Sequence, residues 1–548
     1  MESSSAGPRL ELTWHGKDKF LLSPKDDSGK PVWVERDHPA ASEVRLTDFT
    51  VSVGDVSDNP YADNLLFTGD SLEMLRVLAE TPEFCQEYRG KIKLVYIDPP
   101  FNTGQTFTHY DDWMDHSTWL SFMRDRLLLI KELLAPGGSV WVHLDNYEVH
   151  RMRVLLDEIF GADQFLNTII WKRTTAKNSA VRSLGTMYDS ITGYGKSSES
   201  KVNKVLMPYS EEYLASDYKY NDEKGRFRIS DLTAPGIRNG DSGKEWRGFN
   251  PTDKRRHWTA PKADSLLPLE MQSWSTRQKL DALDDAGYIF WRPTAGSMPL
   301  FKRYLDPNGG VAMGDVWSDM PTPNPRDKER VGYDTQKPEA LLERLINVCS
   351  EGGDIVLDCF GGSGTTAAAA HKMGRRWVTC EILPVTVDEF TQPRLERVVK
   401  GEDLGGISRS VGWSGGGGFR TVTVAPSMYE LTDFGVVLAD WATNGRFSRA
   451  VAGQLGFEYS DDSAPFCGTR GRMRLAVFDG AVGPEEIRHV IAGLGEKERV
   501  TVVAQAVLPG AEELLMELSK GSRVRKAPRD LLTSGARRAR RRTEGTPS

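Results

Sequence analysis

The sequence predicts an α/β protein built on a doubly wound, mostly parallel sheet, and three segments support this prediction. The apolar run at residues 94–97 has the pattern of a buried strand and ends in Asp98. A second apolar run, residues 355–357, leads into a glycine-rich turn and then an alanine-rich helix from residue 365 to about 372. A third run, residues 376–380, ends in Glu381. Because open parallel sheets bind ligands at the carboxyl ends of their strands, both acids are expected near a binding site.

The other strands of this sheet are predicted ahead of a long insertion. Strand patterns occur at residues 65–68, 139–144 and 167–171. A helix near residues 119–134 should end before Pro136-Gly137-Gly138. Since the second and third segments above lie beyond the insertion, the sheet domain is predicted to be discontinuous in sequence.

The segment after the first strand, Asp98-Pro99-Pro100-Phe101, predicts chemistry on an aromatic amine. The prolines fix the backbone and remove donors, which leaves the Asp98 side chain and the Pro99 carbonyl as acceptors. Two acceptors suit one exocyclic amino group, because holding both protons favours a pyramidal nitrogen with an aimed lone pair. Phe101 would stack on a base that has left the duplex. The alternative is an ordinary strand followed by a Pro-Pro turn.

The glycine-rich turn predicts a cofactor site. Its glycines let the backbone approach a ligand closely, and the following helix start offers unpaired amides. The Gly-Lys-Ser/Thr ending of a P-loop is missing, so a ligand with a carboxylate and a ribose fits better than ATP, with Glu381 placed for ribose hydroxyls. A tight strand-to-helix connection is the alternative. The candidate cofactor residues here are Asp358, Phe360, Gly361, Gly362, Gly364, Thr365 and Glu381.

These motifs, in this order, resemble the S-adenosylmethionine-dependent DNA amino-methyltransferases of the permuted (beta) group, over residues 60–400 or so. The resemblance implies a Rossmann-like methyltransferase fold with S-adenosylmethionine as cofactor. Residues 332–342 look like the family motif in which Lys337 would approach the methionine carboxylate. Residues 65–72 resemble the strand and acid near the cofactor's adenine, which makes Asp70 a further candidate, although a strand ending in a turn would look similar.

A narrower resemblance, to modification subunits of type III restriction systems, rests on the overall pattern and the start at residues 14–17. The family's Asp-Pro-Pro-aromatic form is mostly associated with the adenine 6-amino group, so adenine is predicted, with the cytosine 4-amino group as the alternative. Cys359 replaces the usual proline and Phe101 the commoner tyrosine. Transfer to an amine needs no cysteine nucleophile, and Cys359 and Cys380 are interpreted as small buried hydrophobes.

Composition limits the function classes. With 548 residues and 39% hydrophobic content, the chain should form two or three domains. Its five cysteines have no Cys-x-x-Cys spacing, and no apolar segment is long enough for a membrane helix, so a cytoplasmic protein without a metal site is expected. A net charge of −7 means that DNA contact requires a local patch. Cations interleave with aromatic residues at Lys244, Trp246, Arg247, Lys254, Arg255, Arg256 and Trp258. This pattern suits phosphate contact and stacking on bases, although a solvated face with half-buried rings would look the same.

The expected organisation is an N-terminal extension (1–60), a catalytic half (61–172), a target-recognition insert (173–330), a cofactor-binding half (331–404), a glycine-rich linker (405–420), a small α/β domain (421–525) and a basic tail (526–548). In the small domain, strands are predicted at 472–478 and 500–507, and helices at 484–494 and 511–518. The resemblance implies duplex DNA, a second copy of the chain and a separate restriction or defence subunit as partners. A non-catalytic DNA-binding or partner-binding protein and an RNA amino-methyltransferase are the rival functions.

Overall fold

The computed structural model describes residues 11–23, 30–103, 114–174, 184–260, 273–294, 296–306, 309–432 and 435–532. They divide into two compact units. One unit is residues 204–313, and the described residues on either side of it form the other.

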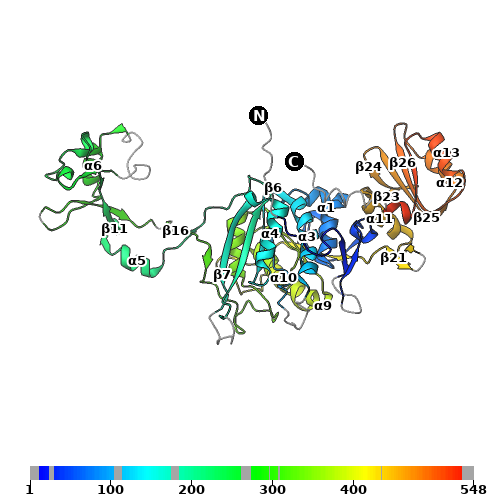
Figure 1. Ribbon diagram of the computed structural model, residues 1–548, viewed down its shortest axis with the longest axis horizontal. Coiled ribbons are helices and arrows are strands. Elements are labelled where there is room, and N and C mark those ends of the chain that lie inside the picture. Colours follow the sequence, from blue (N-terminus) through cyan, green and yellow to red (C-terminus); the bar gives the residue numbers. More distant parts are fainter. Residues whose placement is uncertain are drawn as a thin grey trace. The chain divides into compact units, whose positions relative to one another are not determined.

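The larger unit contains a ten-stranded sheet in the order β17-β7-β8-β6-β5-β18-β19-β4-β20-β3 (Figure 1). Neighbouring strands from β6 to β20 are all parallel, whereas β8 and β3 run antiparallel to their neighbours. The predicted doubly wound, mostly parallel sheet is therefore confirmed. The strands are β3 Thr47–Gly54, β4 Asn64–Thr68, β5 Ile92–Ile97, β6 Leu134–Leu144, β7 Phe165–Lys172, β8 Tyr188–Gly195, β17 Val316–Trp317, β18 Ile355–Asp358, β19 Arg376–Glu381 and β20 Gly418–Val424.

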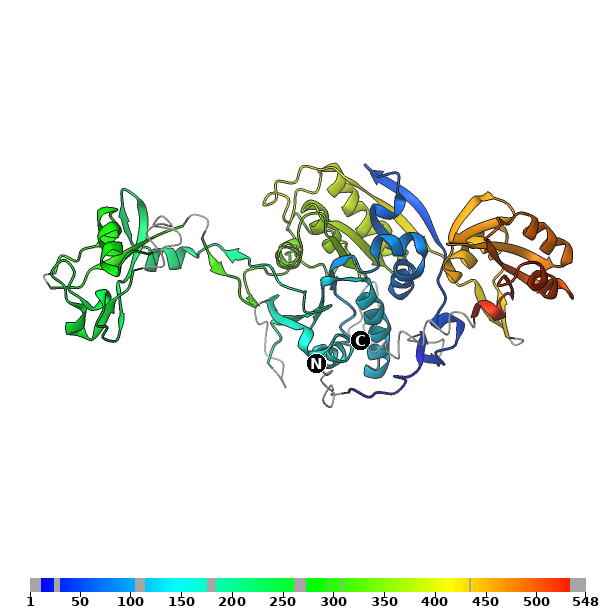
Figure 2. The same ribbon diagram turned by 90° about the horizontal axis from the view of Figure 1, so that it is seen from above.

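Helices cover both faces of this sheet (Figure 2). One layer contains α1 to α4, and the other contains α7, α8 and α10, with neighbours in each layer in contact. Buried strands such as β5 are apolar on both sides, as expected for a parallel sheet between two helical layers. The helices are α1 Ser71–Glu80, α2 Pro82–Tyr88, α3 His116–Leu133, α4 Val149–Phe160, α7 Glu339–Cys349, α8 Thr365–Lys372, α9 Pro384–Thr386 and α10 Gln392–Lys400. Shorter elements are β1 Phe20–Ser23, β2 Val32–Val34, the 3₁₀ turns η1 Pro39–Ala41, η2 Pro60–Ala62 and η3 Ala162–Gln164, and a π-helical turn, Val387–Thr391.

The unit of residues 204–313 has its own four-stranded sheet, in the order β10-β11-β15-β14, and its own core. Two short strands, β9 and β16, pair antiparallel near its two ends and so bring its entry and exit together. Its elements are β9 Leu206–Met207, α5 Glu211–Asp217, β10 Tyr220–Asp222, β11 Gly225–Asp231, β12 Thr233–Pro235, η4 Asp241–Gly243, η5 Pro251–Lys254, β13 Arg256–Trp258, α6 Thr276–Asp285, β14 Ile289–Phe290, β15 Leu300–Tyr304 and β16 Val311–Ala312.

This unit is narrower than the predicted insert of residues 173–330. Strands β8 and β17, which fall inside that range, belong to the large sheet. The sequence hid them for two reasons: β8 consists largely of small and polar residues although it is almost entirely buried, and β17 has only two residues.

The small C-terminal region is α/β as predicted, with a five-stranded sheet in the order β23-β24-β25-β26-β27. The predicted strands at 472–478 and 500–507 are β25 and β26, and the two predicted helices are α12 and α13. The elements are β21 Tyr429–Thr432, β22 Gly435–Leu438, α11 Asn444–Leu455, β23 Glu458–Ser463, β24 Phe466–Arg470, β25 Met473–Val482, α12 Pro484–Ala492, β26 Arg499–Val507, α13 Ala511–Leu518 and β27 Arg523–Lys526.

Three other predicted boundaries need correction. The N-terminal extension (1–60) contributes the edge strand β3, and the end of the 405–420 linker begins β20, which pairs with both β4 and β3. The tail predicted from residue 526 includes Leu531, which is buried in the core of the small region, and residues 533–548 lie outside the described part. The glycine-rich composition of the linker and the charged composition of the tail gave no sign of these contacts in the sequence.

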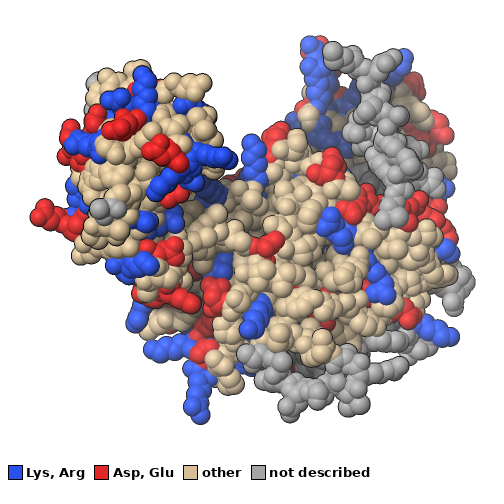
Figure 3. Space-filling model, turned by 60° about the vertical axis from the view of Figure 1, so that its left-hand side comes forward, with Lys and Arg blue, Asp and Glu red and all other residues tan. Residues whose placement is uncertain are grey.

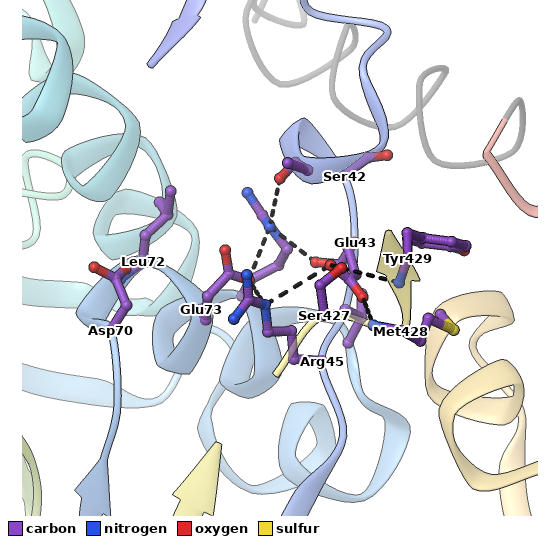
Figure 4. Close-up of polar contacts among 12 residues, drawn as sticks. Ser42, Glu43, Arg45, Asp70, Leu72, Glu73, Ser427, Met428 and Tyr429 are labelled. Carbon is purple, nitrogen blue, oxygen red and sulfur yellow. Dashed lines mark hydrogen bonds and ion pairs between the residues drawn. The ribbon is translucent and has the colours of Figure 1, made fainter. Parts of the chain in front are cut away.

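Buried polar contacts join the start of the small region to the sheet domain (Figure 4). The carboxylate of Glu43, which is 1% exposed, accepts hydrogen bonds from the Met428 amide and the Ser427 hydroxyl, each at 2.7 Å. Arg76 of α1 donates to the Glu43 carbonyl at 2.8 Å and to Glu73 at 3.0 Å. These hydrogen bonds of Glu43 and Arg76 fix the chain leaving β20 against α1.

Candidate active site

Four neighbouring strands of the parallel sheet end in acids that line one cavity. Asp98 follows β5, Asp358 and Glu381 end β18 and β19, and Asp70 follows β4. The cavity has a volume of about 560 Å³, in the range of small-molecule sites. The predicted motifs, far apart in sequence, thus meet at the carboxyl edge of the sheet.

The residues predicted to be catalytic, Asp98, Pro99, Pro100 and Phe101, all line this cavity. Asp98 Oδ2 lies 2.5 Å from the Lys337 ammonium, whereas Asp98 Oδ1 is buried and accepts no hydrogen bond among the described residues. A buried carboxylate oxygen without a donor is costly unless a ligand supplies one. Asp98 is therefore arranged to accept an N–H from a bound molecule.

The motif is held in place by contacts that the sequence interpretation did not include. Asn102 is buried and adopts φ +62°, a left-handed conformation that asparagine tolerates better than most residues. Its side chain donates to Glu148 Oε1 at 2.7 Å and accepts from the Met114 amide at 2.6 Å. Trp119 donates to the Pro100 carbonyl at 2.8 Å. The asparagine after Phe101 was the available signal, because a buried turn of this kind favours that residue.

The glycine-rich turn is tied to the end of β19. The Gly361 amide donates to the Cys380 carbonyl at 2.7 Å, and the Gly362 amide donates to Glu381 Oε2 at 3.0 Å. The other Glu381 oxygen accepts from the Leu383 amide at 3.0 Å. Burial raises the pKa of Glu381, and the backbone hydrogen bonds lower it in part. A Cβ on Gly361 would lie 2.4 Å from Thr379 Oγ1, so this close approach requires glycine.

Gly364 supports the turn from behind the cavity. It has φ +76°, and a Cβ there would lie 3.1 Å from Thr391 Cγ2. The cavity is lined by the other predicted cofactor residues, namely Asp70, Lys337, Asp358, Phe360, Gly361, Gly362, Thr365 and Glu381.

Asp358 is the most perturbed acid of the cavity. Burial raises its pKa to about 7, and hydrogen bonds from the Thr366 hydroxyl and the Phe360 amide oppose this shift. Asp358 therefore changes charge near neutral pH, next to the glycine turn.

A charged network behind the turn was not predicted. Glu339, at the start of α7, is fully buried and pairs with Lys372 at 2.8 Å and Arg394 at 2.8 Å. Arg394 also donates to Thr365 Oγ1 at 2.8 Å. Lys372 pairs with Asp403 at 3.0 Å, which balances the charges. The network holds the first residue of α8 at the cavity.

Two predicted ligand contacts have protein partners in this structure. Lys337, expected at the methionine carboxylate, pairs with Asp98 and lies 5.3 Å from the centre of the Phe101 ring. Asp70, expected near the adenine, caps α1 through the Leu72 amide and pairs with Arg126 at 2.8 Å. Both residues line the cavity. In the protein without a ligand, their contacts with other residues position neighbouring elements.

The two cysteines at the cavity are inert. Cys359 and Cys380 are buried, and burial raises the pKa of both thiols well above the usual value. They remain protonated at neutral pH, as expected for packing residues. No cluster of three or more His, Cys, Asp or Glu placed to hold a metal occurs in the described ranges.

The predicted DNA-binding residues lie in the unit of residues 204–313, but the tryptophans do not face solvent. Trp246 and Trp258 are 3% and 1% exposed and form part of that unit's core. The expectation that they stack on bases is therefore wrong, because indoles of this size stabilise a small core. Arg256 pairs with Asp231 at 3.0 Å and Arg247 with Asp284 at 3.1 Å. Of the predicted DNA-binding cations, Lys244, Arg247, Lys254 and Arg255 are exposed.

The residues of the cavity fit S-adenosylmethionine. Glu381 and the close glycine backbone suit a ribose and an amino-acid moiety, and Phe360 and Phe122, with ring centres 6.0 Å apart, offer an apolar wall. Asp98 Oδ1 supplies the acceptor that an amine substrate needs.

Comparison with known proteins agrees with this geometry. A family model described as DNA methylase, for N6 and N4 methyltransferases, matches residues 92–392, more than half of the chain. The protein belongs to the DNA methylase family. This membership confirms the prediction of a DNA amino-methyltransferase with S-adenosylmethionine as its cofactor. Within the described ranges, no helix of this DNA methylase is both long and apolar enough to cross a membrane.

Individual relatives extend the match. The type II methyltransferase M.EcaI of Enterobacter cloacae is 30% identical over 379 residues, which is 68% of this chain and 75% of that protein. The probable type III restriction-modification enzyme HindVI Mod subunit of Haemophilus influenzae is 31% identical over 445 residues, 68% of this chain. The match spans 56% of that subunit's length. A putative DNA modification methylase from Thermus thermophilus, solved with S-adenosyl-L-methionine, is 19% identical, with 66% of this chain and 99% of that one covered and a TM-score of 0.32.

Proposed function

We propose that this methyltransferase acts on the 6-amino group of adenine in duplex DNA, at a specific sequence, as the modification component of a restriction-modification or phage-defence system. The observation that carries the proposal is that Asp98 Oδ1, in the same cavity as the glycine turn, accepts no hydrogen bond from the described residues. An amine bound there lies beside the cofactor site.

The cavity residues account for the reaction as follows. S-adenosylmethionine, when bound, supplies an electrophilic methyl group. Asp98 Oδ1 and the Pro99 carbonyl accept hydrogen bonds from the two amine hydrogens and so aim the nitrogen lone pair at the methyl group. Phe101 stacks on the flipped base. A neutral amine that gains a methyl group becomes positively charged, and the Asp98 carboxylate stabilises that charge as it develops. The nitrogen then loses one proton to solvent, which leaves the neutral methylamino product. Adenine is favoured because the Asp-Pro-Pro-aromatic motif is the form that the family mostly pairs with its 6-amino group.

Residues 204–313 are proposed to recognise the target sequence. This unit has 17 Lys and Arg against 15 Asp and Glu, whereas the whole chain has a net charge of −7. Figure 3 shows both signs interspersed over the visible face rather than one basic coat. Exposed cations such as Lys254 and Arg255 would contact phosphates, which sets the register without reading sequence.

Single-molecule sequencing tests base, site and activity together. DNA from a methylation-free host expressing the wild type should contain one modified adenine motif, which is absent with Asp98→Ala. A modified cytosine motif would mean that the enzyme acts on the 4-amino group of cytosine, and the other parts of the proposal would stand. Soluble wild-type protein that modifies neither base, alone or with candidate partner subunits, would reject the proposed activity.

Assembly with other chains is also proposed from relatives named as Mod subunits. Light scattering of the purified chain and co-expression with a candidate restriction or defence subunit would test a homodimer and a hetero-complex. A monomer that co-purifies with no such subunit would reject this part of the proposal.

A further inference from the structure

A buried chain of side chains lies behind Phe101, and none of its members was predicted as a site residue. His143, on β6, is fully buried, and its Nδ1 lies 2.7 Å from the Tyr96 hydroxyl. Its Nε2 lies 3.2 Å from Asp189 Oδ2. Burial raises the pKa of Tyr96 well above its usual value, so Tyr96 stays a donor. The contacts to Tyr96 and Asp189 hold the imidazole at both ring nitrogens and so fix the orientation of the His143 ring.

Asp189 in turn contacts Arg173 and holds it in place. Asp189 is 1% exposed, and although burial raises its pKa, the hydrogen bond from His143 and the charge of Arg173 lower it overall. The residue is therefore ionised at neutral pH. Its second oxygen, Oδ1, accepts no hydrogen bond among the described residues and lies 3.4 Å from Arg173 Nε. Arg173 is thus held at its Nε end by an anion.

Arg173 lies at the cavity on the side of Phe101. Trp171, Arg173 and Asp189 all line it, and His143 connects them to the catalytic motif. The His143 ring centre is 5.8 Å from that of Phe101 and 5.4 Å from that of Trp171. The Arg173 backbone is fixed as well, because its amide donates to the Met187 carbonyl at 3.0 Å and its carbonyl accepts from Thr322 at 2.9 Å.

The base expected in the cavity requires a hydrogen-bond donor from the protein beside its amine. A flipped adenine or cytosine donates its amine hydrogens to acceptors such as Asp98. The ring nitrogen next to the amine has no hydrogen and can only accept a hydrogen bond. A carboxylate such as Asp189 would repel that nitrogen. A guanidinium suits it, since the contact with Asp189 engages Nε and no described residue engages its two terminal nitrogens.

We infer that Arg173, positioned by the Tyr96, His143 and Asp189 chain, reads the target base by donating to the ring nitrogen next to the exocyclic amine. That atom is N1 of adenine or N3 of cytosine. The inference rests on the proposed function and deepens it, because it names a specificity-determining residue that lies beyond the catalytic motif. The ion pair of Arg173 is with Asp189 rather than with Glu381 or the glycine turn, so cofactor binding should not depend on it.

A two-by-two comparison of enzyme and substrate tests this contact. Wild type and Arg173→Met are assayed by single-turnover methyl transfer on the duplex found by sequencing, and on the same duplex with 1-deazaadenine, or 3-deazacytosine, at the target. Removing the ring nitrogen should slow the wild type by roughly 10- to 100-fold, the usual effect of losing a charged hydrogen bond. Arg173→Met should be slowed by a similar factor on the natural base and should hardly distinguish the two substrates. The changed basicity of the analogue's amine affects both enzymes and cancels in the comparison.

Two further variants separate base reading from folding. Lys172→Met, an exposed neighbour on β7 that does not line the cavity, should discriminate between the two duplexes as the wild type does. Asp189→Asn keeps the side-chain shape but removes the charge that holds Arg173, so it should weaken discrimination without changing cofactor affinity. An active wild type with independent, multiplicative losses from Arg173→Met and the analogue would overturn the inference alone. A wild type that methylates no duplex would instead reject the proposed function from which it starts.

Discussion

Glu339→Gln should destabilise the sheet domain far more than an ordinary loss of a salt bridge. Glu339 is fully buried and accepts hydrogen bonds from Lys372, Arg394 and the Ile407 amide. The substitution leaves Lys372 with Asp403 as its ion-pair partner and Arg394 with no ion pair among the described residues. Breaking a buried pair in this way costs about 3–5 kcal/mol, because one charge stays without compensation. At about 2–4 °C for each kcal/mol, the melting temperature should fall by roughly 6–20 °C.

Asp319→Asn supplies a matched control, since it breaks a pair made by Arg344 on the same helix. Asp319 accepts two hydrogen bonds from Arg344, at 2.9 and 2.6 Å, but its side chain is 54% exposed. An exposed pair contributes at most about 1 kcal/mol. Calorimetry should separate the variants clearly, and cofactor affinity measured by titration should fall only for Glu339→Gln, because Arg394 anchors Thr365. If both variants melt alike, the charge-balance argument is wrong.

The roles of Asp98 and Gly364 should separate. Asp98→Asn should slow methyl transfer by roughly 100-fold or more with cofactor affinity nearly unchanged, whereas Gly364→Asp, at φ +76°, should weaken cofactor binding first; equal binding losses in both would refute the division. The pKa of Asp358, about 7 against 3.8 for a free side chain, means that the folded chain holds the extra proton between these values. Stability should therefore fall as pH rises from about 4 to 7, and a pH series of unfolding curves should lose this slope in Asp358→Asn. Asn102→Ala should cost about 1–3 kcal/mol, since it leaves buried partners unsatisfied at φ +62°, and Asn102→Gly should retain the backbone conformation and lose less in the same melting assay.

Local sequence patterns predicted the elements that carry the site. Continuous apolar runs identified β5, β18 and β19, and the helix expected at residues 365–372 has the bounds of α8. The acids that end those strands were identifiable because strand ends, glycines and prolines are local features. Their convergence on one cavity followed from the parallel topology alone.

The remaining features depend on contacts between distant residues. Trp246 looked like a stacking residue because a tryptophan flanked by cations has the same local pattern in a small core as at a nucleic-acid surface. The pairing of Glu339 with Arg394 joins residues 55 positions apart, so no periodicity indicates it. Strand β8 escaped detection because its burial comes from its neighbours in the sheet rather than from apolar side chains.

Strand register, rather than loop conformation, sets the distance between Asp98 and the glycine-rich turn. β5 and β18 are hydrogen-bonded neighbours with Val95 opposite Leu357, so Asp98 and the glycine turn leave the sheet side by side although about half of the chain's length separates them. The unit of residues 204–313 begins and ends with the paired strands β9 and β16, which follow β8 and precede β17 in the chain. On the proposed role of this unit in target recognition, changes of sequence within it should alter which DNA is bound while Asp98 and the glycine turn keep their spacing. A target-recognition unit that evolves independently of the chemistry needs this separation.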